Sequence, residues 1–423
     1  MIDVVTFGCR LNAYESEAIR RTTQAAAVED VVVVNTCAVT GEAVRQARQA
    51  IRRFRRERPD ARIVVTGCAA QADPAAFAAM PEVDRVIGND DKLHADAWLA
   101  TRAAFARMPA SGVAAREKIA VGDIMAVKQA TAPLVEAIEG RTRAFVQIQN
   151  GCDHRCTFCV IPFGRGNSRS RPMDEVMVQV RRLLDNGYRE IVLTGVDLTS
   201  YGADLPGTPR LGELTKRILR QAPELARLRL SCLDAVEVDR DLLDALASDD
   251  RLMPHLHLSL QAGDDLILKR MKRRHRRAEA IAFCEEVRRL RPDVVFGADI
   301  IAGFPTESEA MFARSLDLVD ECGLVHLHVF PFSPRPGTPA ARMPQVDRAV
   351  VKERARRLRE KAAAALRRHL DQEVGARRRV LTESRELGRT EHFTPVRFAA
   401  PVDPAVILDV TVAAHDGRRL IAA

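Results

Sequence analysis

The sequence predicts an α/β protein with three parts: an N-terminal open parallel α/β sheet domain, a central partial (β/α)6 barrel, and a small antiparallel β-barrel at the C-terminal end. Strand-like and helix-like segments alternate through the first hundred residues, and a second alternating series starts near Phe145. Such alternation indicates parallel βαβ units. Beyond residue 375 the pattern changes to short strands separated by turn signals, which is typical of a small closed sheet.

The N-terminal domain is expected over residues 1–105. Its strands are expected at 2–9, 30–37 and 61–68, and the helices between them at 15–27 and 42–59. Residues 106–140 lack sharp periodicity and hold Pro109, Gly112, Gly122 and Pro133, so we expect a linker there.

The central domain is expected over residues 141–375. Its six apolar runs lie at 144–151, 190–197, 228–232, 255–261, 294–304 and 324–332. Helical patterns separate the runs, and a long basic helix over 347–374 ends the domain. Six such units predict an open or partial barrel, smaller than the closed eight-unit form. The last domain, 376–423, contains the hairpin turn signal HDG at 415–417.

Charge and cysteine content limit the classes of function. The net charge is +8, the pI is about 9.2, and basic residues cluster at 45–59, 272–277 and 351–369. The clusters favour a polyanionic partner, although an arginine-rich composition that only decorates helices is the alternative. We expect a cytoplasmic protein, because no stretch resembles a signal core or membrane span. The nine cysteines of a reducing compartment then suggest metal ligation, catalysis or burial.

Three cysteines lie close together in the segment GCDHRCTFC, at Cys152, Cys156 and Cys159. A zinc site would need a second pair with similar spacing, and the chain has none. Three thiolates suit a four-iron four-sulfur cluster with one iron open to another ligand. The segment follows the first strand of the central series, where a barrel places its active site.

The N-terminal domain ends each of its three expected strands with a cysteine: Cys9, Cys37 and Cys68. The carboxyl ends of parallel strands form the ligand crevice of an open sheet, so these thiols should meet. A second three-thiolate cluster is the interpretation we favour. Plain burial of small residues in core strands is the alternative.

The whole layout resembles one enzyme family. GCDHRCTFC is similar to the signature of radical S-adenosylmethionine (SAM) enzymes, and the three-part chain is similar to the radical SAM methylthiotransferases, which end in a TRAM domain. Further similar segments are LTGVDLTSYG at 193–202, HLHLSLQAGDDLILKRM at 255–271, DIIAGFPTESE at 299–309, HVFPFSPRPGTPA at 328–340 and ELGRTEHF at 386–393.

This resemblance implies two [4Fe–4S] clusters and SAM as cofactors. Cys152, Cys156 and Cys159 would hold the cluster that binds SAM and supplies the electron for its cleavage to a radical. Cys9, Cys37 and Cys68 would hold the sulfur-donating cluster. The implied reaction uses one SAM as methyl donor and another as radical source. It also needs a low-potential electron donor as a partner.

Candidate SAM-binding residues lie at strand ends: Thr194, Gly195, Asp197, Gln261 and Gly303, with Phe158 between two cluster ligands. The two glycines would permit close backbone approach, although a plain turn would also explain them. His257 is expected to be a satisfied core group. Cys232, Cys284 and Cys322 are expected to be buried small hydrophobic residues.

Within the family, the run CTFCVIPFGRGNSRSRP is most similar to enzymes acting on N6-threonylcarbamoyladenosine beside the tRNA anticodon. The expected partner is therefore the anticodon loop of tRNA, with no DNA and no membrane. Arg165, Arg169 or Arg171 could pair with the carboxylate of this base, or contact phosphate. Isopentenyladenosine and an aspartate of a ribosomal protein remain alternative substrates. A non-enzymatic iron–sulfur RNA-binding redox sensor is the alternative from another class.

Overall fold

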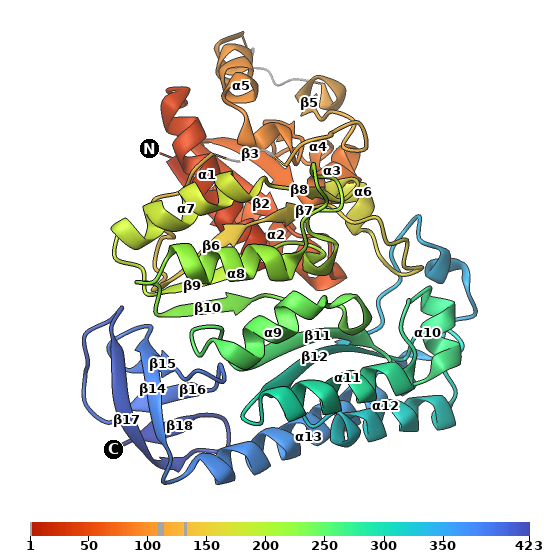
Figure 1. Cartoon of the computed structure of the whole chain (residues 1–423). Coiled ribbons are helices and arrows are strands. Elements are labelled where there is room, and N and C mark those ends of the chain that lie inside the picture. The colour runs from red at the N-terminus through yellow and green to blue at the C-terminus, as the bar shows by residue number, and fades with distance from the viewer. Residues whose placement is uncertain (1, 108–113, 131–132) are drawn as a thin grey trace. The chain divides into compact units, whose positions relative to one another are not determined.

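The computed structural model of this chain describes residues 2–107, 114–130 and 133–423 (Figure 1). The chain divides into two compact units. The N-terminal unit comprises Met1–Glu139, Gln147–Arg155 and Cys159–Pro172. The barrel unit comprises Gly140–Val146, Cys156–Phe158 and Met173–Ala423. Among the described residues, no helix is both long and apolar enough to span a membrane.

The N-terminal unit contains a five-stranded sheet in which every neighbouring pair is parallel, in the order β1-β2-β3-β4-β5. The strands are β1 (Ile2–Thr6), β2 (Val31–Thr36), β3 (Arg62–Gly67), β4 (Arg85–Ile87) and β5 (Ile119–Ala120). The first three confirm the predicted strands. The edge strand β5 lies within the segment that we expected to be a linker, because two residues carry too little periodicity to reveal a strand.

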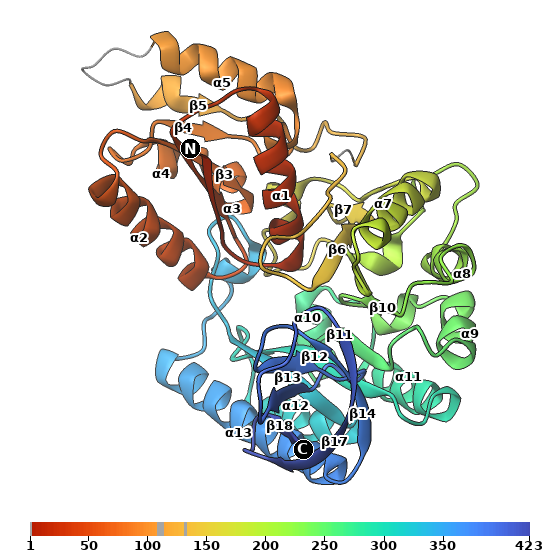
Figure 2. The same cartoon turned by 90° about the vertical axis from the view of Figure 1, so that its left-hand side faces the viewer.

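Helices cover both faces of this sheet, as Figure 2 shows for α1 and α2. The helices are α1 (Arg10–Ala25), α2 (Gly41–Glu57), α3 (Cys68–Ala72), α4 (Pro74–Ala78) and α5 (Ala95–Arg107). Along β2, Val32 and Val34 pack with Ile51 of α2, whereas Val31 and Val33 pack on the other face with Ile19 of α1 and Trp98 of α5. A strand buried on both faces reads as a continuous apolar run, as VVVV does.

A short hairpin-like pair completes the N-terminal unit. Strands β7 (Gln149–Asn150) and β8 (Arg169–Ser170) pair antiparallel, and helix α6 (Ile161–Arg165) lies between them in sequence. Helix α6 packs on α3, and a Cβ on Gly164 would lie 2.9 Å from the carbonyl oxygen of Cys68. Only glycine therefore allows this close approach of the two helices.

The barrel unit contains the six strands predicted for the central domain. They are β6 (Arg143–Gln147), β9 (Glu190–Thr194), β10 (Arg227–Leu230), β11 (His255–Gln261), β12 (Val295–Ala302) and β13 (Leu324–Pro331). They form two three-stranded sheets, β10-β9-β6 and β11-β12-β13. Isolated parallel bridges, Leu228 to Leu252 and Leu233 to Leu258, connect the edges of these sheets. The prediction of a partial rather than closed barrel is confirmed.

Seven α-helices of seven or more residues accompany these strands. They are α7 (Met173–Asp185), α8 (Leu211–Gln221), α9 (Arg240–Ser248), α10 (Asp265–Met271), α11 (Arg277–Leu290), α12 (Glu309–Glu321) and α13 (Arg348–Glu373). Side-chain caps begin several of them; Asp239, for example, accepts a hydrogen bond from the backbone N–H of Leu242 at 3.0 Å. The long basic helix predicted near 347–374 is α13.

The C-terminal segment forms a closed five-stranded barrel with the order β14-β15-β16-β18-β17. The strands are β14 (Arg377–Thr382), β15 (Leu387–Arg389), β16 (Pro395–Phe398), β17 (Ile407–His415) and β18 (Leu420–Ala422). The predicted hairpin at 415–417 joins β17 to β18. We predicted an antiparallel barrel, but one pair of strands, β16 with β18, is parallel. Sequence periodicity sets the faces of a strand but not its partner.

A buried ion cluster attaches this small barrel to the rest of the barrel unit. Glu190 on β9 pairs with Arg229 on β10 at 2.8 Å, and Arg143 and Arg227 also approach its carboxylate. The other nitrogens of Arg229 donate to the backbone carbonyl oxygens of Thr390 and Glu391, at 2.8 and 2.7 Å. Burial raises the pKa of Glu190, but the three arginines outweigh this effect and lower the pKa overall.

We predict that Glu190→Gln destabilises the barrel unit by about 3–5 kcal/mol, because the buried guanidinium groups of Arg227 and Arg229 lose their carboxylate partner. Urea unfolding measures the change in the free energy of unfolding. The control is Glu224→Gln, since Glu224 is exposed and surface substitutions usually change stability by about 0.5 kcal/mol or less. Equal stability of the two variants would contradict the role of Glu190.

Candidate cluster and cofactor sites

The three strand-end cysteines of the N-terminal unit follow β1, β2 and β3, which are adjacent in the sheet. Cys9 is the N-cap residue of α1, Cys37 directly follows β2, and Cys68 is the first residue of α3. Two glycines permit this crowding at positive φ. A Cβ on Gly8 would lie 2.7 Å from Sγ of Cys37, and one on Gly67 would lie 2.3 Å from the carbonyl oxygen of Thr36.

The environment of these thiols suits an iron–sulfur cluster. Cys9 is exposed, whereas Cys37 and Cys68 are buried. The N–H of Val39 donates to Sγ of Cys37 at 3.4 Å, and Nδ2 of Asn89 donates to Sγ of Cys68 at 3.8 Å. Burial and the neighbouring Cys68 raise the pKa of Cys37 to about 12, and burial also raises that of Cys68. Such thiols become thiolates when a metal replaces their protons, so the donor set fits a cluster.

The second cysteine set lies in the loop between β7 and α6. In the N-terminal unit, the backbone N–H of Cys152 donates to the carbonyl of Gly166 at 3.1 Å, and the N–H of Ile161 donates to Sγ of Cys159 at 3.4 Å. Gly151 has φ +73°, and a Cβ there would lie 1.9 Å from the carbonyl oxygen of Asn167. Backbone contacts therefore hold this loop, and the close contact at its first residue, Gly151, is possible only for glycine.

Residues Cys156–Phe158 belong to the barrel unit. The N–H of Thr157 donates to the carbonyl of Met271 at 3.0 Å, and Nη1 of Arg273 donates to Sγ of Cys156 at 3.7 Å. Arg273 also pairs with Asp234. The segment KRRHRR at 272–277 was interpreted as part of a polyanion-binding surface, but Arg273 points to a cysteine and is only 6% exposed. Sequence clustering alone cannot distinguish inward from outward arginines.

Phe158 packs against Phe304, with ring centroids 6.4 Å apart, in an apolar cluster at the ends of β11 and β12. Gly303 precedes Phe304 in the sequence and has φ +74°. A Cβ on Gly303 would lie 2.6 Å from the side chain of Val351 on α13. Close packing of a helix therefore already accounts for this glycine. Its SAM-binding role stays a prediction.

The other candidate SAM residues also lie at carboxyl ends of strands in the barrel unit. Thr194 ends β9 and is followed by Gly195, and Gln261 ends β11 with φ 68°. Asp197 accepts hydrogen bonds from the hydroxyls of Thr199 and Ser200, at 3.1 and 2.5 Å. The sheet order places these positions at the ends of β9, β11 and β12, where partial barrels bind ligands.

The three candidate substrate arginines are all buried, with exposed fractions of 1–3%. Arg165 donates to both carboxylate oxygens of Glu15, at 2.7 and 3.0 Å. Arg169 donates to the backbone carbonyls of Arg165 and Asn167, and Arg171 donates to the hydroxyl of Tyr14. These contacts favour a role in holding the loop over contact with a substrate carboxylate.

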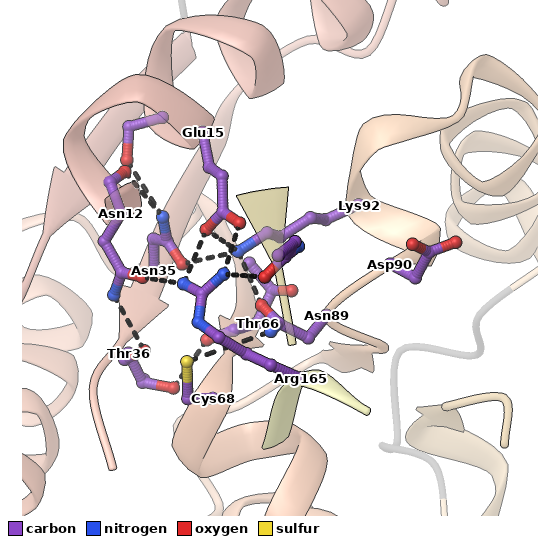
Figure 3. A network of polar contacts seen from close by, with 12 residues as sticks. Asn12, Glu15, Asn35, Thr36, Thr66, Cys68, Asn89, Asp90, Lys92 and Arg165 are labelled. Carbon is purple, nitrogen blue, oxygen red and sulfur yellow. Dashed lines mark hydrogen bonds and ion pairs between the residues drawn. The ribbon is translucent and has the colours of Figure 1, made fainter. Parts of the chain in front are cut away.

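Figure 3 shows the polar network around Arg165, which includes two charged residues that the sequence did not single out. Glu15 of α1 and Lys92 are both fully buried and pair at 2.7 Å. Burial raises the pKa of Glu15, but Arg165 and Lys92 outweigh it and lower the pKa to about 2. A polar residue at an apolar helical position, such as Glu15 between Leu11 and Ile19, was the signal available in the sequence.

Inside the barrel unit, His257 of β11 is bonded to Asp299 of β12 at 2.8 Å, and His328 of β13 approaches the same oxygen at 3.0 Å. The expectation of a satisfied histidine thus agrees with its environment. Cys284 and Cys322 are buried as expected. Cys232 differs, because it is half-buried and its sulfur lies 3.0 Å from the hydroxyl of Ser259.

The basic clusters differ in how far acidic residues neutralise them. On α13, Arg356 pairs with Glu353 and Glu360, and Arg357 pairs with Glu309. On α2, the arginines that line a groove of about 580 Å³ are less closely paired with carboxylates. Its lining residues are Phe7, Gln46, Gln49, Ala50, Arg52, Arg53 and Arg56. The nearest carboxylates to Arg52 and Arg53 are 3.9 and 3.8 Å away, and both arginines are more than half exposed.

Comparison with known proteins agrees with this arrangement. The profile of the radical SAM superfamily matches residues 146–319, and that of uncharacterized protein family UPF0004 matches residues 1–88. Threonylcarbamoyladenosine tRNA methylthiotransferase MtaB of Rickettsia prowazekii is 49% identical over 94% of this chain and 91% of its own length. The chain belongs to the radical SAM tRNA methylthiotransferases of this type. The resemblance inferred from its sequence is confirmed.

Two further comparisons show what else the chain is similar to. The tRNA-2-methylthio-N(6)-dimethylallyladenosine synthase of Ruegeria pomeroyi is 33% identical over 94% of this chain and 92% of its own. A solved structure of the radical SAM methyltransferase TsrM of Kitasatospora setae, with tryptophan and a SAM analogue, has a TM-score of 0.54. It covers 76% of this chain and 66% of its own at 17% identity, so the likeness concerns the fold alone.

Membership in the methylthiotransferases implies a [4Fe–4S] cluster and SAM, and it supports a second cluster. We predict that Cys156→Ala and Cys37→Ala each lower the iron content of reconstituted protein from about eight to about four per chain. Each set of thiols would lose one ligand while the other set stays complete. Cys284→Ala is the control, since its buried thiol should leave the iron content unchanged. A Cys37→Ala protein with the full iron content would contradict the assignment of Cys9, Cys37 and Cys68.

Proposed function

We propose that this methylthiotransferase adds a methylthio group to C2 of N6-threonylcarbamoyladenosine beside the anticodon of tRNA. One SAM would provide the methyl group and a second the radical. The observation that carries the proposal is the similarity over nearly the whole chain to the Rickettsia enzyme of that name, together with two separate sets of three cysteines.

Cys152, Cys156 and Cys159 would hold the cluster that supplies the low-potential electron and an open iron for SAM. The chain's own residues shape this site. Arg273 donates to Cys156 and so stabilises negative charge on that sulfur. Phe158, packed on Phe304, presents an apolar surface that excludes water near the ends of β11 and β12. The strand ends with Thr194, Asp197 and Gln261 are the proposed contacts for SAM.

Cys9, Cys37 and Cys68 would hold the cluster from which the sulfur is delivered. The contrast in burial supports this division of roles, since Cys9 is exposed while the other two are buried. Buried ligands retain a cluster, and an exposed side leaves room for an incoming reactant. Asn89 and the N–H of Val39 donate to the buried sulfurs and orient them.

Isopentenyladenosine in tRNA is the second candidate substrate, because the Ruegeria enzyme named for the dimethylallyl form is also similar over most of its length. The higher identity to the Rickettsia enzyme favours the threonylcarbamoyl form. An aspartate of a ribosomal protein is less well supported, since the relatives compared act on tRNA by name. A redox sensor that does not bind SAM would not need the candidate SAM-binding residues at the ends of β9, β11 and β12.

Mass analysis of nucleosides tests the substrate. We predict that tRNA from cells lacking the protein loses the methylthio form of N6-threonylcarbamoyladenosine and accumulates N6-threonylcarbamoyladenosine without the methylthio group. Complementation with the wild-type chain should restore it, whereas Cys156→Ala should not. Loss of methylthiolated isopentenyladenosine instead would identify the second substrate, and an unchanged tRNA profile with an altered ribosomal protein would exclude RNA as substrate.

The groove on α2 is the proposed contact for the phosphate backbone, because its arginines are exposed and weakly paired. We predict that Arg52→Gln with Arg56→Gln weakens tRNA binding and lowers the slope of log K against log salt by about one per lost phosphate contact. The matched control is Arg356→Gln with Arg357→Gln on α13, where carboxylates already pair with both side chains. A larger effect from α13 than from α2 would contradict this placement.

A further inference from the structure

The network around Arg165 contains more positive than negative charge. Glu15 provides one carboxylate, whereas Lys92 and Arg165 provide two cations, and each of the three side chains is at most 2% exposed. The ammonium of Lys92 donates to Glu15 at 2.7 Å, to Asn35 at 3.1 Å and to Asn89 at 2.6 Å. Three acceptors satisfy the three N–H groups of a charged ammonium. The network therefore carries one buried positive charge in excess.

Neighbouring acidic groups do not balance this charge. Asp90, at the edge of Figure 3, pairs with His94 at 3.1 Å and lies 3.9 Å from Arg169. Asp91 is directed to the N–H of Gly122 at 3.2 Å. An uncompensated buried charge is costly unless a counter-ion approaches it. The missing negative charge must come from another group in contact with the network.

The network contacts Cys68 and Cys9 directly and also contacts the residue before Cys37. Asn89 accepts from Lys92 and donates to Sγ of Cys68, and Asn12 accepts from Arg165 at 2.6 Å and lies 3.9 Å from Sγ of Cys9. Asn12 also donates to the carbonyl of Thr36, the residue before Cys37. Asn89 thus links Lys92 to Cys68, as Figure 3 shows, and Asn12 links Arg165 to Cys9 and to the residue before Cys37.

We propose that Lys92, Arg165 and Glu15 form the built-in counter-charge of the auxiliary cluster and set its reduction potential. This inference rests on the proposed assignment of Cys9, Cys37 and Cys68 as cluster ligands. An oxidised four-iron core carries two positive charges, and three thiolates give the assembly one net negative charge. This charge equals the excess of the network in size and is opposite in sign.

Reduction adds one electron to the cluster, so nearby positive charge favours the reduced form. Glu15→Gln raises the charge of the network by one and should raise the potential. Lys92→Met lowers it by one and should lower the potential. The double variant returns the network to its original charge and should return the potential close to that of the parent. A network that only holds the fold in place would not produce shifts of opposite sign that cancel.

The test uses full-length protein carrying Cys156→Ala, which removes the other cluster and isolates the auxiliary signal. A redox titration followed by electron paramagnetic resonance should show that each single variant changes the ratio of reduced to oxidised cluster at fixed potential by about tenfold, or about 59 mV. Arg356→Gln, far along the chain on α13, is the matched control and should leave the potential unchanged.

The outcomes separate this inference from the function it rests on. A parent protein without auxiliary iron would contradict the cysteine assignment itself. A parent with normal iron whose potential does not move in the variants, or moves in one direction for both, would overturn the counter-charge role alone. If Lys92→Met fails to fold, the upward shift expected for the near-isosteric Glu15→Gln still decides the sign, and no shift there overturns the proposal.

Discussion

The ion pair between Glu15 and Arg165 joins two segments that lie 150 positions apart in the sequence. Both partners are buried, so Arg165 cannot remain charged without Glu15 except at a cost of several kcal/mol. Their pairing places α6 against α3, where Gly164 meets the backbone of Cys68. The loop with Cys152 and Cys159 therefore belongs to the same compact unit as Cys9, Cys37 and Cys68, although the radical SAM profile begins at residue 146.

Several arginines of this chain are buried structural residues rather than surface charges. Arg227 and Arg229 satisfy backbone carbonyls of the C-terminal barrel and share the carboxylate of Glu190. Arg273 reaches Cys156, and Arg354 of α13 binds Glu307 at 3.0 Å. The planar guanidinium suits such sites because it is weakly hydrated and can bind several acceptors at once. The net charge of +8 therefore overstates the basic surface available to RNA.

Histidine and cysteine show the same dependence on context. His257 is hydrogen-bonded to Asp299 and packs against His328. The ring centroids of the two histidines are 4.6 Å apart. Cys284 and Cys322 are buried, while Cys232 contacts a polar hydroxyl. A cysteine packed among apolar side chains and a cysteine next to a polar group have the same residue type and the same sequence periodicity. The neighbours that distinguish them come from other strands.

The sequence by itself determined the first three strands of the N-terminal sheet, the six strands of the partial barrel, the C-terminal small barrel and the six cysteines of interest, because hydrophobic period and residue spacing are local properties. It also placed Cys9, Cys37 and Cys68 at one sheet edge, since parallel strands share the direction of their ends. Only the tertiary structure decided that Arg165, Arg169 and Arg171 are buried, that Lys92 and Glu15 join them, and that β16 pairs parallel with β18. These features depend on partners far apart in the chain, whose meeting is set by packing and charge compensation rather than by any local pattern.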